Sequence, residues 1–323
     1  MDTTPNTLGR INQSSIQLCP EQLTLQYETR RLTVLSFGAG QDSTDILYRY
    51  AYDRSFRNRY ARGRFIVTMS DTGDEHTHTY RHIAYIKTFC IQRGIEFHFL
   101  TPEMGFHSPK WPSLIEFFRR THTIGVKSLH KSCSDQLKIQ PFYRWLDAFA
   151  NAQLGTRLTR KRALIEYARC YGKIRVLIGL AAGEESRVAD PASLPDWQIR
   201  SIETVYPLIE LGVDRRGCQQ NIRSLGHEVP WPSNCRRCHF LSKVELLWLH
   251  RRHPDAFDEW VFLENQKLAR FQHKGKKNYT VWGRSRKTLS EILAEAKAEF
   301  GHLSDEDLDE YKMSHGHCVN TRY

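Results

Sequence analysis

The sequence predicts an α/β protein built on a doubly wound parallel sheet, with a mainly helical, cysteine-containing region at its C-terminal end. Short, mainly apolar runs of strand length begin at Leu32, Arg64, Ile95 and Ile174. Segments with apolar residues at helical spacing separate them, which is the alternation expected of parallel strands joined by crossover helices. Ligands bind at the carboxyl ends of the strands in such sheets, so we expect the functional site there.

The loop after the first strand has the composition of a phosphate-binding turn. Its glycines allow backbone amides to approach an anion, and the helix that follows adds partial positive charge at its N-terminus. No Gly-Lys-Ser/Thr sequence follows, and Ser43 stands where the dinucleotide-binding pattern needs its third glycine. An ordinary strand-to-helix turn is the alternative. The candidate anion-binding residues are Ser36, Gly38, Gly40, Asp42, Ser43 and Thr44.

This loop resembles the Ser-x-Gly-x-Asp-Ser pyrophosphate loop of the ATP pyrophosphatase, or adenine nucleotide alpha-hydrolase, superfamily, with two extra residues between Ser36 and Asp42. The later segment Asp71-Thr72-Gly73 resembles a motif that the phosphoadenosine-phosphosulfate (PAPS) reductase branch places against its nucleotide. The resemblance implies ATP and Mg²⁺ as cofactors and Asp42 as a catalytic residue. A plain turn with Asp and Gly in their usual places is the alternative for Asp71-Thr72-Gly73.

Two further segments resemble the same branch. The stretch from Cys133 to Pro141 contains a cysteine followed by Lys-x-x-Pro, and 179–187 matches a Gly-x-x-x-x-Glu-x-x-Arg turn. The resemblance implies that Lys138 and Arg187 contact the nucleotide phosphates. There they would stabilise the charge that develops during cleavage, so both are catalytic candidates.

The eight cysteines favour metal or redox chemistry over a disulfide framework, because the N-terminus lacks a signal peptide and a cytoplasmic protein is expected. Cys235-x-x-Cys238 can present two thiolates to one ion. With the Tyr-Pro-Leu strand at 205–210 and a cysteine in the next helix, this pair resembles short PAPS reductase-like proteins of phages and mobile elements, related to the ATP pyrophosphatases of DNA phosphorothioation. The candidate ligands of a zinc ion or an iron–sulfur cluster (4Fe-4S) are Cys133, Cys218, Cys235 and Cys238.

The balance of charges indicates a polyanionic partner. Among 323 residues, 47 lysines and arginines oppose 36 acids, giving a net charge of +11. Nucleic acid, either DNA or tRNA, is the partner expected, although a merely basic surface gives the same count. No apolar run approaches the ~20 residues that span a bilayer, so no membrane contact is expected. Basic and aromatic side chains at 273–287 suit either nucleic acid binding or the packing of Trp282 onto the sheet.

Four regions are expected along the chain: an N-terminal arm at 1–30, the α/β nucleotide-binding domain at 31–212, a cysteine-containing helical region at 213–300 and a tail at 301–323. The tail contains Cys318, a catalytic candidate because PAPS reductases also end in a motif with a catalytic cysteine. The Glu-Cys-Gly order of that motif is absent, since His317 precedes Cys318.

Three functional hypotheses follow. The first is an ATP pyrophosphatase-type transferase that adenylylates an acceptor, after which sulfur from a donor such as a cysteine desulfurase is transferred to nucleic acid. The second is a reductase of phosphoadenosine- or adenosine-phosphosulfate, in which a cysteine thiolate attacks sulfur. The third is a nucleotide-binding protein without catalysis.

Overall fold

The computed structural model describes residues 30–129, 132–274, 277–283 and 285–315. Its centre is a five-stranded sheet of order β3-β2-β1-β4-β5 in which all neighbouring pairs are parallel. Val34 on the central strand pairs with Ile66 on one side and Val176 on the other. This arrangement confirms the predicted doubly wound sheet. The strands are β1 (Leu32–Ser36), β2 (Arg64–Ser70), β3 (Glu96–Leu100), β4 (Ile174–Ile178) and β5 (Ile202–Val205).

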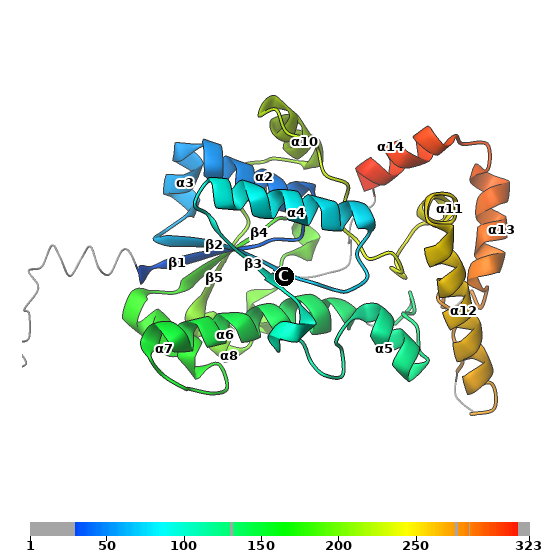
Figure 1. The fold of residues 1–323 in the computed structure, drawn as a ribbon, viewed down its shortest axis with the longest axis horizontal. Coiled ribbons are helices and arrows are strands. Elements are labelled where there is room, and N and C mark those ends of the chain that lie inside the picture. The colour runs from blue at the N-terminus through cyan, green and yellow to red at the C-terminus, as the bar shows by residue number, and fades with distance from the viewer. Residues whose placement is uncertain (1–29, 130–131, 275–276, 284, 316–323) are drawn as a thin grey trace, which may run out of the picture.

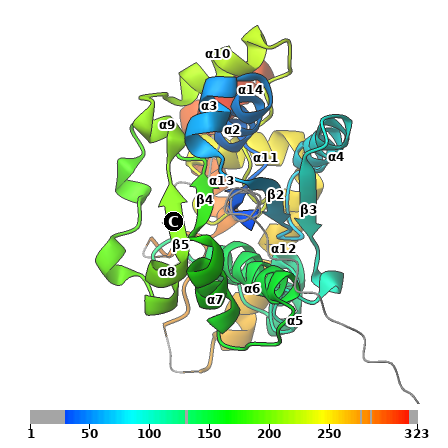
Figure 2. The ribbon, with the colours of Figure 1, turned by 90° about the vertical axis from the view of Figure 1, so that its left-hand side faces the viewer.

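Helices cover both faces of the sheet (Figures 1 and 2). Successive strand residues point to opposite faces, so Leu35 and Val67 belong to one apolar core while Val34 and Ile66 belong to the other. One face is covered by α2 (Gln41–Tyr52), α3 (Arg54–Tyr60), α4 (Thr77–Gln92) and α10 (Arg215–Ser224). The other is covered by α6 (Gln140–Leu154), α7 (Arg162–Tyr171) and α8 (Asp196–Ser201).

The helical segment that follows β1 is divided into two helices, α2 and α3. The Asp53 side chain accepts hydrogen bonds from the backbone amides of Ser55 at 2.8 Å and Phe56 at 3.1 Å, so it caps a new helix, α3. The remaining short elements are the 3-10 turns Pro102–Met104, Glu185–Arg187 and Pro191–Ser193, the π-helical turn η2 (Asp135–Ile139), and α9 (Pro207–Glu210).

A separate helical region stands beyond the carboxyl ends of the strands (Figure 1). It has its own apolar core, in which Leu246 and Trp260 are completely buried. Ser242 and Glu245 form a capping box that starts its first long helix. Its helices are α5 (Leu114–Thr121), α11 (Lys243–Arg252), α12 (Pro254–Phe271), α13 (Leu289–Phe300) and α14 (Asp305–His315).

The expected region boundaries differ from the structure in two places. Helix α10 packs on the sheet, with Ile222 in the same core as Leu35, although its sequence was assigned to the helical region. Residues 305–315, assigned to the tail, form α14 and bury Leu308 in the helical core. The ammonium of Lys312 in α14 is fully buried, 3.1 Å from the Glu245 carboxylate, which ties this helix down. The arm at 1–29 lies outside the described residues.

Val281 and Trp282 belong to the helical region. Val281 is buried in the helical core and Trp282 packs against it, with the Lys127 ammonium 4.2 Å from the Trp282 ring centroid. Residues 281–282 therefore pack onto the helical region.

Among the described residues, no helix combines the length and the apolar character needed to cross a membrane.

Candidate functional site

A cavity of about 340 Å³ opens where β1, β2 and β4 end. This volume lies within the range of small-molecule sites. The loop between β1 and α2 forms part of its wall, together with residues from η2 and from the turn after β4. Seven of the sequence-predicted site residues line it, namely Ser36, Gly38, Gly40, Asp42, Ser43, Lys138 and Arg187.

Hydrogen bonds within the loop hold it around the N-terminus of α2. The Gly38 amide donates to the Ser43 hydroxyl at 3.1 Å, and that hydroxyl donates to the Gly40 carbonyl at 3.3 Å. Gly40 is the N-cap of α2, so the helix begins two residues before Ser43. The first amides of this helix consequently border the cavity, where their partial positive charge favours an anion.

The glycines of the loop leave open space in the cavity. The left-handed φ of the turn, +56°, falls on Ala39 rather than on a glycine. A Cβ added at Gly38 would come no closer than 3.9 Å to another protein atom, and one at Gly40 no closer than 3.5 Å. The fold itself therefore does not require glycine at these two positions. The absence of side chains instead lets a ligand reach the backbone.

Gly179 is needed for a different reason. A Cβ at this position, directly after β4, would stand 2.8 Å from the Ser43 amide nitrogen. Real Cβ atoms do not approach backbone so closely, so only glycine allows the end of β4 to lie against the start of α2. This close contact fixes the loop relative to the turn that carries Arg187.

Ion pairs join the two sides of the cavity. The Asp42 carboxylate lies 3.0 Å from the guanidinium of Arg215, which also lies 2.9 Å from Glu184. Glu184 in turn pairs with Arg187 at 2.8 Å. Arg215 lines the cavity and was missed by the sequence analysis. It is the first residue of α10, capped by Asp214, in a segment whose sequence bears no phosphate-binding pattern.

Another part of the cavity wall is mostly apolar and aromatic. Phe142, Tyr143 and Leu194 line it, and the Gln198 amide donates to the Tyr143 hydroxyl at 3.0 Å. Such a wall suits the flat face and polar edge of a nucleobase. No sequence pattern pointed to these residues, because they come from two helices and a loop far apart in the chain.

Asp71, Thr72 and Gly73 do not line this cavity. The Asp71 carboxylate accepts hydrogen bonds from the Gly73 amide and the Tyr80 hydroxyl, both at 2.9 Å, and burial raises its pKa. Gly73 has a φ of +66°, and a Cβ there would stand 2.3 Å from that of Ser113. The segment therefore forms a tight turn packed on the start of α5.

Thr44 also points elsewhere. Its hydroxyl lies 3.0 Å from a ring nitrogen of His82 on α4, and the residue is fully buried. It joins α2 to α4 and does not line the cavity.

A second, smaller cavity of about 20 Å³ lies beside the first, and we call it the thiol pocket. Cys133, Cys235 and Cys238 all line it, from segments about a hundred residues apart. The Cys235 thiol lies 3.5 Å from the Thr72 hydroxyl and donates to it. Burial raises the pKa of this thiol well above its ordinary value, with Glu75 adding to the effect and Lys138 opposing it.

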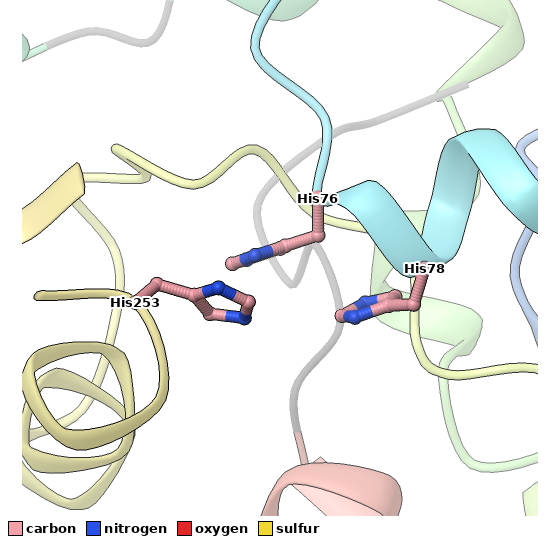
Figure 3. Close-up of side chains that lie close together, drawn as sticks. All are labelled: His76, His78 and His253. Atoms are coloured by element: carbon pink, nitrogen blue, oxygen red, sulfur yellow. The ribbon is translucent and has the colours of Figure 1, made fainter. Parts of the chain in front are cut away.

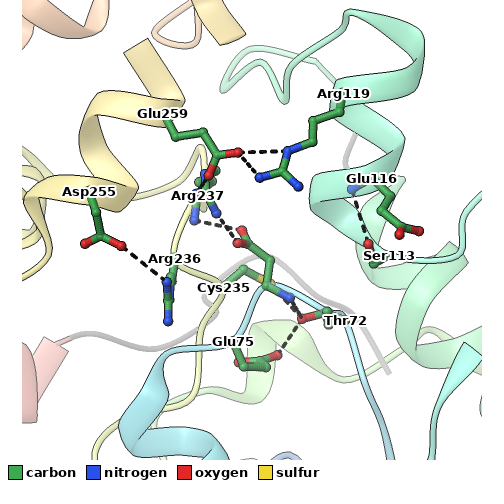
Figure 4. A network of polar contacts seen from close by, with 12 residues as sticks. Thr72, Glu75, Ser113, Glu116, Arg119, Cys235, Arg236, Arg237, Asp255 and Glu259 are labelled. Carbon is green, nitrogen blue, oxygen red and sulfur yellow. Dashed lines mark hydrogen bonds and ion pairs between the residues drawn. The ribbon is translucent and has the colours of Figure 1, made fainter. Parts of the chain in front are cut away.

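A buried polar network holds the cysteine turn against the turn after β2 (Figure 4). The Arg236 amide donates to the Asp74 carbonyl at 2.8 Å, and the Arg237 amide to the Asp74 carboxylate at 3.1 Å. The Arg237 guanidinium pairs with both Asp74 and Glu259, so it also connects α12. The sequence gave no indication of this role for Arg237.

Cys218 is not part of the thiol pocket. It is completely buried between α10 and α2, and burial raises the pKa of its thiol. The predicted set of four cysteine ligands is therefore not brought together: α10 packs on the sheet, whereas the other three cysteines meet at the border of the helical region. Cys318 lies outside the described residues.

Lys138 lines both cavities. It belongs to η2, the single π-helical turn that leads into α6, and its carbonyl accepts a hydrogen bond from Ser70. Turns of this type occur often at functional sites. The Lys138 ammonium lies 3.4 Å from the Glu75 carboxylate, on the turn that packs against Cys235.

Comparisons with known proteins give a distant structural similarity only. No protein-family model matches the chain, and no curated protein does. Among solved structures, the chain is similar to the U34-tRNA thiolase NcsA from Methanococcus maripaludis with its 4Fe-4S cluster, at 15% identity and a TM-score of 0.39. The alignment covers 88% of this chain and 82% of the thiolase. A similarity of this degree assigns neither an activity nor a ligand to this chain.

Proposed function

We propose that this protein is an ATP-dependent, pyrophosphate-releasing transferase that adenylylates an acceptor and then replaces the adenylate with sulfur. The observation that carries the proposal is the position of Lys138, a residue that lines both the larger cavity and the thiol pocket. A nucleotide bound in the first would have its phosphates within reach of the residue that faces the cysteines.

The larger cavity supports the first half of the reaction. The apolar part of the wall would contact adenine, and the loop amides with Lys138, Arg187 and Arg215 would face the phosphates. An acceptor oxygen would attack the α-phosphorus, breaking the bond to the β-phosphate oxygen, and pyrophosphate would leave. Asp42 is the only acidic residue among the described residues that line the cavity, so we assign to it the contact with Mg²⁺.

The thiol pocket supports the second half. Cys133, Cys235 and Cys238 line this pocket together, so we propose that they would hold a metal group, either a zinc ion or an iron–sulfur cluster. Such a cluster would supply iron–sulfide chemistry, and its entry would displace side chains that now enclose the small cavity.

Without a bound metal group, the thiols can carry sulfur themselves, which is the alternative route. A donor such as a cysteine desulfurase would leave a persulfide on one of them. Its terminal sulfur would attack the adenylylated carbon and displace AMP. A second thiol of the pocket would then break the sulfur–sulfur bond, leaving the product thiolated and a disulfide that a reductant must reopen. The net charge of +11 makes nucleic acid, DNA or tRNA, the acceptor that we propose.

A reductase of phosphosulfate compounds is the second candidate, favoured by the sequence of the Lys138 stretch. It would need Cys318, which the structure does not describe. A non-catalytic nucleotide-binding protein is the third candidate. The two differ from our proposal in their products, because the reductase would release sulfite and the binding protein neither sulfite nor pyrophosphate.

The test measures pyrophosphate release from ATP and sulfur incorporation into nucleic acid with the same anaerobic protein. We expect Asp42→Asn to lose both and Cys235→Ser to lose only sulfur incorporation. Lys138→Ala should lose both, whereas Lys173→Ala, an exposed lysine before β4, should lose neither. Sulfite production from PAPS without pyrophosphate release from ATP would contradict the proposal. So would a Cys235→Ser variant that loses pyrophosphate release as fully as Asp42→Asn does.

A further inference from the structure

We propose that His76, His78 and His253 form a binding site for a divalent transition metal of the zinc class, separate from the thiol pocket. One ring nitrogen from each lies within 4.8 Å of those of the other two. His76 caps the N-terminus of α4, His78 is in its first turn, and His253 stands between α11 and α12 (Figure 3). The three rings thus come from two regions of the fold and converge on one point.

Two of these rings have buried nitrogens with no hydrogen-bond partner. His76 is only 1% exposed, and its Nδ1 contacts no donor or acceptor. The Nε2 of His78 is also buried without a partner. A buried polar atom left unsatisfied costs about 1–3 kcal/mol. A metal ion at the centre of the three rings would give these nitrogens the partner that the protein does not supply.

The electrostatic surroundings favour the metal-binding form of the rings. Burial is the main cause that lowers the pKa of all three histidines, and the nearby cations Lys312 and Arg236 lower it further. A lowered pKa favours the neutral imidazole, which is the form that ligates a metal. The Lys312 charge is offset by Glu245 at 3.1 Å, so it opposes a bound cation less than an isolated ammonium would.

The donor set selects the class of metal. Three imidazoles without a carboxylate suit zinc, copper, nickel or iron, and are poor ligands for Mg²⁺ or Ca²⁺, which prefer oxygen. Three histidines also leave the fourth position of a tetrahedral ion open to water.

The bound ion would connect two parts of the fold. His76 directly follows Asp74 and Glu75, the residues that hold Arg237 and Lys138 beside the thiol pocket. His253 belongs to the junction of α11 and α12. A metal that joins them therefore fixes the wall of the thiol pocket to the helical region.

The test is a titration of the metal-free full chain with Co²⁺, followed by visible absorption, in a Cys235→Ser background that removes the Cys-x-x-Cys pair. We expect one Co²⁺ per chain. His78→Ala and His253→Ala should each weaken binding at least tenfold, and the exposed His302→Ala should not change it. Zn²⁺ should raise the Tm of the parent and not that of either ligand variant.

X-ray absorption of the zinc-loaded Cys235→Ser protein separates this site from thiolate binding. Imidazole nitrogen scattering that decreases in His253→Gln supports the proposal. Sulfur-dominated scattering, absence of cobalt binding by the parent, or equal binding by the histidine variants and His302→Ala would overturn it. His253 is partly exposed and lies at a helix boundary, so His253→Gln keeps the test valid even where His78→Ala disturbs folding.

Discussion

The larger cavity and the thiol pocket are neighbours built in different ways. The larger cavity takes a continuous part of its wall from one loop, 36–43, and adds residues from several other segments. The thiol pocket takes Thr72, Cys133 and Cys235 from three distant segments, and the buried Arg237 ties the turn of Cys235 to the turn after β2. A site made by a local backbone conformation is robust to distant changes, whereas one assembled by packing depends on every contact that joins its parts.

The largest effect is expected when the Arg237 guanidinium is removed, which tests whether the thiol pocket depends on long-range packing. Arg237→Ala leaves the Asp74 carboxylate buried without its cation, and we expect unfolding free energy to fall by about 3–5 kcal/mol. Arg236→Ala is the matched control, because Arg236 faces the exposed Asp255 at 3.9 Å and should cost less than about 1 kcal/mol. Urea unfolding measures both. Equal losses would show that the pocket does not depend on this ion pair.

Two glycine substitutions sharpen the account of the loop. Gly179→Ala forces a Cβ against the Ser43 amide. We expect it to lower the free energy of unfolding by about 1–3 kcal/mol and also to weaken ATP binding. Gly38→Ala meets no protein atom closer than 3.9 Å, so it should weaken ATP binding while leaving unfolding unchanged. Calorimetric titration with ATP and thermal unfolding measure the two effects. Unchanged ATP binding in Gly38→Ala would remove the loop from the binding site.

The pH dependence of stability tests the link between α2 and α4. Burial lowers the pKa of His82 to about 4. The unfolded chain, with an ordinary histidine pKa near ~6.5, then binds more protons between these values, so His82 makes the fold less stable as pH falls through this window. His82→Gln should reduce this acid sensitivity by about 2 kcal/mol, since the ring is partly exposed. Parallel slopes for the two proteins in urea unfolding between pH 6.5 and pH 4 would contradict this assignment.

The smallest effect separates the two kinds of cysteine. Cys218→Ala removes a buried sulfur from the α10–α2 contact and should lower stability by about 1 kcal/mol without changing bound iron, zinc or sulfide. Cys235→Ala should abolish whatever metal the thiol pocket holds. Metal and sulfide analysis of anaerobically purified protein measures this. Loss of metal in Cys218→Ala would return Cys218 to the ligand set.

Local patterns anticipated part of the wall of the larger cavity. The loop glycines, Ser43 and Arg187 line one cavity because they follow strands that the alternation of elements already indicated. Lys138 also lines it, but it lies in η2 between two helices and was indicated by the resemblance alone. Arg215 was missed, since a single arginine at the start of a polar helix forms no recognisable sequence pattern. Asp71 was a candidate site residue that does not line the cavity. Its turn occurs at a strand end, but its carboxylate accepts hydrogen bonds from Gly73 and Tyr80.

The amino-acid sequence by itself determined the parallel sheet and the bare-backbone loop, since apolar periodicity and glycine placement act within a few residues along the chain. Only the tertiary structure decided which cysteines meet. Cys218 has the same chemistry as the others, yet packing α10 on the sheet buries it in a separate core. The same holds for His76 and His253, which lie 177 positions apart and converge only because the α11–α12 junction packs against the start of α4. Long-range packing, which has no local signal, sets these contacts.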